Sequence, residues 1–319
     1  MTLISDTYAL LSRAIPGRSS GVWFRRMRVI MYSLLYPHVS GVWLRALVQD
    51  PLLTGMALRN RRFLERPYHP AFQSGMTTRD RVALVCEHFR VAAAPFWSAV
   101  TRRVYLNGEA VTLAYHERYA IVLSNPTRCW REGLLTVAWR DEAACVDLAW
   151  ATISFELHRE TGLPGILVGG LQGPRGNGRE LVREATRACH GLRPKAAVME
   201  AVCMLCRIAQ VRVLAAVTTR AHISRAGSSE FHADYDAFWR EMGGVESEGR
   251  FVLPLRPYHR DISKVPSNRR AVFRRRQELI ANLLAQFDTV LGMAGEGHVE
   301  VRAPAAQEAD VPYHQVIEA

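Results

Sequence analysis

Four side chains in the second half of the chain have the chemistry to move protons: His190, His222, Asp234 and Tyr235. His190 stands directly before Gly191 at the predicted end of a helix, where the helix dipole favours an imidazolium. His222 follows a predicted buried strand, at an edge where α/β proteins often bind ligands. Proton transfer in catalysis needs a base and an acid placed near the reacting atoms, and these four residues are our catalytic candidates.

Each of these residues also has a purely structural interpretation. Asp234 and Tyr235 begin a predicted helix, where a carboxylate caps free amides and complements the dipole. His190 can likewise serve as a residue that caps a helix end. The sequence leaves both interpretations open, because it gives neither the distance to a substrate nor the pKa.

Two glycine-containing turns flank the helix that ends at His190, and either could bind an anion. The first, Gln172-Gly-Pro-Arg-Gly-Asn-Gly178, joins a predicted strand to a helix, and the second, Gly191-Leu-Arg-Pro-Lys195, opens the next helix. Free N–H groups and the dipole at a helix start attract phosphate groups, and arginine and lysine strengthen such a site. The residues that we expect to bind an anionic cofactor, the donor of a transferred group, are Gln172, Gly173, Arg175, Arg193 and Lys195. Alternatively, each turn uses glycine only for its backbone angles.

The cysteines predict core packing rather than a metal site. Cys203-Met-Leu-Cys206 has the Cys-x-x-Cys form, but it lies in the middle of a predicted helix with apolar neighbours, whereas zinc sites usually take ligands from turns. Cys189, beside His190, is the one cysteine in a setting that could favour a nucleophilic thiolate. We expect no metal.

The elements that must position these residues change in character along the chain. Residues 1–104 carry apolar positions at helical spacing between prolines, which predicts a helical N-terminal region. Short runs rich in Val, Leu, Ile and Trp follow at 111–116, 119–124, 133–140, 144–157 and 165–170, which predict an antiparallel meander. Helices are then predicted at 178–190, 194–210 and 234–242, and strands at 211–218 and 251–255.

The fold class predicted by this order is α+β, in four parts. A mixed sheet flanked by helices spans 105–260, a basic C-terminal helix spans 261–291, and a loosely ordered tail spans 292–319. These parts follow the helical region 1–104.

The net charge of +11, from 41 Lys plus Arg against 30 Asp plus Glu, makes an anionic partner plausible. Arg25, Arg26 and Arg28 precede an apolar run at 29–36, which fits either a helix lying on an anionic membrane or a helix packed on the core with solvated arginines. A second cluster, Arg269, Arg270 and residues 274–276, begins the C-terminal helix and could neutralise phosphates of lipid or nucleic acid. No recognised nucleic-acid module accompanies it.

The start of the chain lacks the basic residues and cleavage site of a secretory signal, and no apolar run has the roughly 20 residues of a membrane span. We therefore expect a cytoplasmic protein that can associate with the inner membrane from its cytoplasmic side. The oligomeric state is not specified by any of these patterns.

Several blocks of sequence resemble the bacterial VirK/YbjX family over most of the chain. They are Gly169-Gly-Leu-Gln-Gly173, Glu184-Ala-Thr-Arg-Ala-Cys-His-Gly-Leu-Arg-Pro-Lys195, Val198-Met-Glu200, Asp234-Tyr-Asp-Ala-Phe-Trp239 with Gly243-Gly244, and Ser267-Asn-Arg-Arg-Ala271 leading to Arg274-Arg-Arg276. The resemblance implies a link to envelope integrity, resistance to antimicrobial peptides and virulence, and it implies no particular reaction.

The order of the elements also resembles the GNAT superfamily of acyl-CoA N-acyltransferases, in which a meander leads through a glycine-rich, pyrophosphate-binding loop into a parallel strand pair. That resemblance implies an enzyme that moves an acyl or aminoacyl group from acyl-CoA, or another activated donor, to an amine. Two other hypotheses remain, a non-catalytic envelope-stress adaptor at the inner membrane surface and a nucleic-acid-binding protein.

Overall fold

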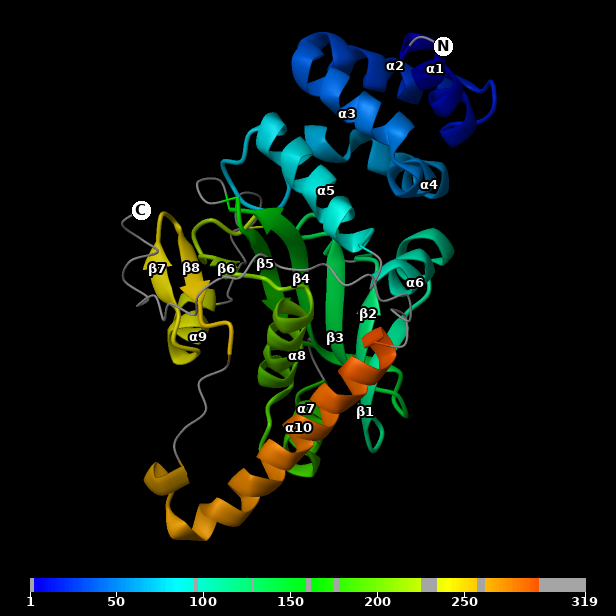
Figure 1. The fold of residues 1–319 in the computed structure, drawn as a ribbon. Coiled ribbons are helices and arrows are strands. Elements are labelled where there is room, and N and C mark those ends of the chain that lie inside the picture. The colour runs from blue at the N-terminus through cyan, green and yellow to red at the C-terminus, as the bar shows by residue number, and fades with distance from the viewer. Residues whose placement is uncertain are drawn as a thin grey trace, which may run out of the picture.

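The computed structural model describes residues 3–94, 97–127, 129–158, 162–174, 178–224, 234–256 and 262–292. A group of N-terminal helices, an eight-stranded mixed sheet and a long C-terminal helix follow one another along the chain (Figure 1). This confirms the predicted α+β class, while the predicted tail lies almost wholly outside the described residues. None of the described helices combines the length and the apolar character needed to cross a membrane.

The N-terminal helices begin where the sequence supplies caps and prolines. They are α1 (Leu3–Ala14), α2 (Ser20–Leu35), α3 (Pro37–Gln49), α4 (Pro51–Arg59), a 3₁₀-helix (Arg61–Tyr68), α5 (Thr78–Ala92), α6 (Ser98–Thr101) and a π-helical turn (Arg102–Asn107). Pro37 and Pro51 occupy first turns, where their missing N–H costs nothing. Asp50 accepts hydrogen bonds from the Leu52 and Leu53 amides and caps α4.

The sheet has the strand order β1-β2-β3-β4-β5-β6-β8-β7. Its strands are β1 (Val111–His116), β2 (Tyr119–Ser124), β3 (Leu135–Asp141), β4 (Val146–Leu157), β5 (Pro164–Gln172), β6 (Val213–Val217), β7 (Val245–Ser247) and β8 (Arg250–Leu253). The first five strands form the predicted antiparallel meander. Strand β7 is not predicted by the sequence, because three residues next to a turn are too few to show alternation.

The one parallel strand pair among the described strands divides part of the way along its length. Residues 165–168 of β5 pair with residues 213–216 of β6, a parallel pair of the kind that the resemblance to the GNAT superfamily implies. Beyond Val168, β5 skips Gly169 in its register with β4 and continues to Gln172, whereas β6 ends at Val217. The two strands therefore part just after Val168.

Two helices link β5 to β6, and two more lie beyond. They are α7 (Gly178–Ala188), α8 (Pro194–Ile208), α9 (Tyr235–Glu241) and α10 (Arg270–Gly292). α8 packs against β3, β4 and β5, while α10 runs along α8 and the edge strand β1 (Figure 1). The buried apolar residues form one continuous core from Leu10 to Leu291.

Candidate functional site

A buried carboxyl, that of Glu132, lies where β5 and β6 part. Its side chain is 4% exposed, and the segment that carries it precedes β3. A Cβ added to Gly169 would lie 1.8 Å from the Glu132 carbonyl oxygen, and one added to Gly170 would lie 2.2 Å from Oε2. Any residue other than glycine has a Cβ that would overlap Glu132, so the two glycines allow Glu132 to lie directly against β5.

Two polar side chains lie next to the Glu132 carboxyl and a third packs beside them, and all three are site residues predicted from the sequence. The Gln172 amide donates to Oε1 at 2.7 Å. His222 Nε2 lies 3.5 Å from the same oxygen. The Tyr235 ring is tilted against the His222 ring with 5.1 Å between centroids. Together these four residues form what we call the Glu132 cluster.

The protonation states of the Glu132 cluster follow from its burial. Burial raises the pKa of Glu132 to about 7, against hydrogen bonds from Cys129 and Gln172 that lower it. Burial lowers the pKa of His222 to about 4, so its ring is neutral at pH 7. The Ser224 amide donates to His222 Nδ1, which leaves the ring proton on Nε2, facing Glu132. Burial, and then the charge of Glu132, raise the pKa of Tyr235 and keep its hydroxyl protonated.

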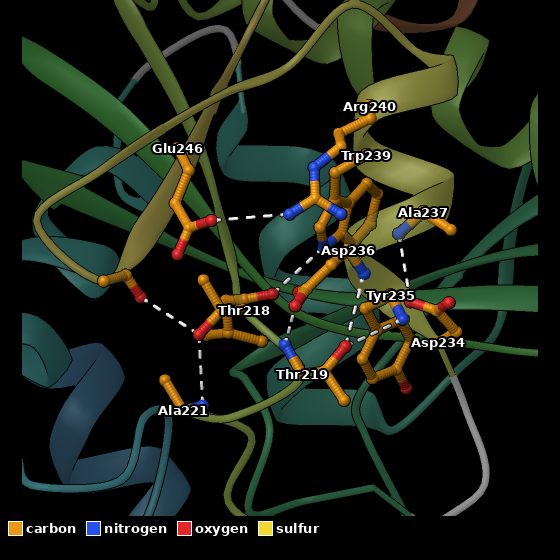
Figure 2. Close-up of polar contacts among 12 residues, drawn as sticks. Thr218, Thr219, Ala221, Asp234, Tyr235, Asp236, Ala237, Trp239, Arg240 and Glu246 are labelled. Carbon is orange, nitrogen blue, oxygen red and sulfur yellow. Dashed lines mark hydrogen bonds and ion pairs between the residues drawn. The ribbon is translucent and has the colours of Figure 1, made fainter.

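The start of α9 is tied to the end of β6, and this positions Tyr235 (Figure 2). Thr219 Oγ1 accepts hydrogen bonds from the amides of Tyr235 and Asp236, at 3.0 and 3.2 Å. In return, Asp236 Oδ1 accepts from the Thr219 amide at 2.7 Å. Farther along α9, Trp239 Nε1 donates to the Val217 carbonyl. Figure 2 shows these contacts converging between the helix and the strand end.

A loop from the N-terminal region holds the two sides of the cluster together. The Phe72 amide donates to the Arg131 carbonyl at 2.6 Å, and the Ser74 amide donates to the Ala221 carbonyl at 2.8 Å. Phe72 adopts a φ of 68°, an uncommon value for a residue with a side chain. Arg66 adds a hydrogen bond to the Gly133 carbonyl. The N-terminal helices thus take part in building the site.

The predicted donor-binding residues are only partly brought together. A Cβ built on Gly173 would lie 3.9 Å from Lys195 Cε, so the start of α8 lies beside the end of β5. Burial lowers the pKa of Lys195. Arg193 is instead exposed and lies 4.0 Å from Glu241 in an ion pair. Arg175 lies outside the described residues.

His190 and Asp234 make contacts that hold helices in place. His190 adopts a φ of 51°, its carbonyl accepts from Arg276 Nε, and its ring lies 6.2 Å from that of His116. Among the described residues, these contacts of His190 are with Arg276 and His116 and not with the Glu132 cluster. Asp234 Oδ1 accepts from the Ala237 amide and caps α9, as its capping interpretation predicted.

The cysteines also follow the structural interpretation. Cys189, Cys203 and Cys206 are free and buried, and the last two pack on the core from α8. Burial raises the pKa of Cys189 to about 12, which disfavours a nucleophilic thiolate. Among the described residues, no group of three or more His, Cys, Asp or Glu side chains could hold a metal ion.

Glu132 is the functional candidate that the sequence analysis missed. It stands in Cys129-Trp-Arg-Glu-Gly133 and has no motif of its own. It is far in sequence from Gly169-Gly-Leu-Gln-Gly173, which we call the glycine signature. The one usable signal was the paired glycines at 169–170 inside a buried strand, which often mark close approach of another backbone.

Comparisons with known proteins support the resemblance to a family. The profile described as "Protein of unknown function (DUF535)" matches residues 18–289. "Uncharacterized protein YbjX" of Escherichia coli (strain K12) is 29% identical over 290 residues, 86% of either chain. An "Uncharacterized protein" of Haemophilus influenzae is 31% identical over 131 residues, 40% of this chain and 44% of that protein. No solved structure matches significantly. Because the profile spans most of the chain, including the glycine signature, the protein belongs to the DUF535, or VirK/YbjX, family.

Proposed function

We propose that this protein transfers an acyl group from an activated thioester donor, such as acyl-CoA, to an amine, and that Glu132 is the base. The amine nitrogen attacks the thioester carbonyl, a C–N bond forms, and the C–S bond breaks. Glu132 takes the proton that leaves the nitrogen and then gives it to the departing thiolate, which closes the cycle. Tyr235 stays protonated throughout, because burial and the charge of Glu132 raise its pKa.

The observation that carries this proposal is the place and the environment of Glu132. It lies where a parallel strand pair divides, and strand ends of this kind are common ligand sites in α/β sheets. A pKa of about 7 suits a general base near neutral pH. The Gln172 amide donates a hydrogen bond to Oε1, which orients the carboxylate, and His222 Nε2 lies 3.5 Å from the same oxygen.

An anionic donor would lie beside Lys195 and Gly173, at the end of β5. These two residues are close to each other, and Gly173 directly follows Gln172 of the cluster. Lys195 lies in the first turn of α8, where the helix dipole also favours a negative charge. This position supports binding of a phosphate-bearing donor next to the base.

The test is release of free thiol from acetyl-CoA and dodecanoyl-CoA in the presence of a panel of amines. We expect the rate to rise with pH through about 7, because Glu132 must lose its proton to act as the base. Glu132→Gln should slow release by about 100-fold or more, the usual effect of losing a general base.

The matched control is Glu200→Gln on α8, a second carboxyl whose pKa burial raises to about 7. Its rate should stay near that of the unaltered protein. Thiol release that is absent with every amine, or equally fast in Glu132→Gln, would overturn the proposal.

A further inference from the structure

Helix α2 exposes an apolar face along its whole length. Its large exposed residues recur at helical spacing, so they lie on one side of the helix. They are Trp23 (62% exposed), Phe24 (67%), Met27 (40%), Ile30 (43%), Met31 (49%), Leu34 (76%) and Leu35 (62%). We call these seven residues the α2 stripe. Scattered apolar surface is normal, but a contiguous row of large side chains marks an interaction site.

The opposite side of α2 already packs on the protein, so the α2 stripe is not the face that folds the helix. Val29 is 1% exposed, and Val22 and Tyr32 pack against the core. Arg26 donates to the Ile15 carbonyl, and Arg28 forms an ion pair with Glu65. The helix is thus anchored from one side and presents the other to the surroundings.

Charge around the α2 stripe is almost all positive. Residues 3–49 contain six arginines and a single acid, Asp6. Neither α2 nor α3 contains an acidic residue, and Arg13 and Arg18 are exposed just before α2. Helices α1 to α3 also lie at one end of the molecule, beyond α5 and the sheet (Figure 1). Among the described elements, the sheet and α5 to α10 therefore lie away from the end that a broad partner would contact.

We propose that the α2 stripe inserts into the interface of an anionic phospholipid membrane, with α2 lying parallel to the surface. The chemistry matches that partner, because aromatic and aliphatic side chains enter the boundary of the acyl chains while arginines contact the headgroups. Trp23 and Tyr36 stand at the two ends of the helix, and both ring types favour the membrane interface. A second copy of the chain fits less well, because two arginine-rich faces would repel each other.

This inference does not depend on the proposed acyl transfer, and its test uses no enzymatic assay. The full-length protein is sedimented with vesicles of phosphatidylcholine alone and of phosphatidylcholine mixed with phosphatidylglycerol. We expect binding to the anionic vesicles that weakens as salt is added. Ile30→Asp combined with Leu34→Asp should weaken binding by about 100-fold or more, since two large apolar groups are no longer buried.

The matched control is Val245→Asp combined with Val272→Asp, which makes the same charge change at two apolar residues that are 49% and 44% exposed elsewhere. This variant should bind vesicles much as the unaltered protein does. Arg13→Gln and Arg18→Gln should weaken binding by about fivefold each. Arg274→Gln combined with Arg275→Gln, at the start of α10, should weaken vesicle binding less than Arg13→Gln or Arg18→Gln does.

Three results would overturn the inference. The first is binding that survives Ile30→Asp with Leu34→Asp. The second is binding that is lost when Arg274 and Arg275 are neutralised, which would place the contact on α10. The third is a protein that does not bind vesicles and forms a dimer in light scattering, where Ile30→Asp with Leu34→Asp separates the dimer. That result would make the α2 stripe an interface between two copies.

Discussion

At the scale of single residues, the glycine signature has a physical explanation in Glu132. Gly169 and Gly170 leave the space that the Glu132 segment fills, and Gln172, two positions farther, donates to its carboxyl. Gly133 completes the fit, because a Cβ there would lie 2.8 Å from the backbone of Ile153. The glycine signature thus makes room for a buried carboxyl in addition to forming a turn. Because that carboxyl is buried, its protonation changes the free energy of unfolding.

The first prediction concerns stability and pH. The pKa of Glu132 is higher in the folded protein, about 7, than its ordinary value of 4.5. Between these values the folded state holds a proton that the unfolded state has lost, so the carboxyl costs stability as pH rises from about 4.5 to 7. The cost is about 3 kcal/mol, taken at about 1.4 kcal/mol for each pKa unit.

Glu132→Gln removes this cost, since the amide stays neutral. We expect urea unfolding to show the variant more stable than the parent at pH 8, with a smaller difference at pH 5. Glu200→Gln should behave in the same way, because burial also raises the pKa of Glu200 to about 7. A difference that is equal at both pH values would contradict the assigned pKa.

At the scale of elements, α9 depends on its anchor rather than on its own length. It has seven residues, too few to persist alone in water. The Thr219 hydroxyl accepts hydrogen bonds from two amides at the start of α9, and Asp234 caps the helix. Trp239 donates a hydrogen bond to the last residue of β6. Tyr235 is therefore positioned by the end of β6.

The second prediction tests that anchor. Thr219→Val keeps the shape of the side chain but removes the acceptor of the Tyr235 and Asp236 amides. We expect a loss of about 1–2 kcal/mol in the free energy of unfolding. Hydrogen exchange at the α9 amides should quicken.

Thr289→Val is the control, because that hydroxyl donates to the Ala285 carbonyl on the exposed side of α10. Its effect should stay within about 0.5 kcal/mol. Equal effects of the two substitutions would mean that Thr219 does not hold α9 in place.

At the scale of the whole molecule, the helices at both ends of the chain share the core of the sheet. Trp43 of α3 is 0% exposed and donates to the Leu64 carbonyl, while Phe287 of α10 is 0% exposed and lies in the same cluster. The division of the chain at residues 104 and 261 remains a prediction about sequence organisation. A continuous core couples these parts.

The third prediction follows from that coupling. Trp43→Ala and Phe287→Ala each remove a large buried ring, which costs about 3–5 kcal/mol. We expect both to lower the midpoint of one shared unfolding transition, seen alike by tryptophan fluorescence and far-ultraviolet circular dichroism. Two transitions, of which each variant shifted only one, would show that the N-terminal helices and the sheet unfold separately.

Local patterns in the sequence predicted most of the elements. β1 and β2 have the bounds that alternation and turn residues predicted, and α8 begins at Pro194 as expected. These features are predictable because periodicity, caps and prolines act over a few neighbouring residues. The family resemblance also followed from blocks of sequence, whereas the parallel placement of β5 beside β6 was implied only by the likeness of the element order to the GNAT superfamily.

The sequence by itself thus determined the order and the type of most of the elements, the family, and three members of the cluster: Gln172, His222 and Tyr235. Only the tertiary structure decided that Glu132 lies at their centre, that His190 lies apart, and that the apolar side of α2 faces outward. Those facts depend on contacts between segments far apart in the chain. Local periodicity shows that a helix has an apolar face, but only packing decides what covers it.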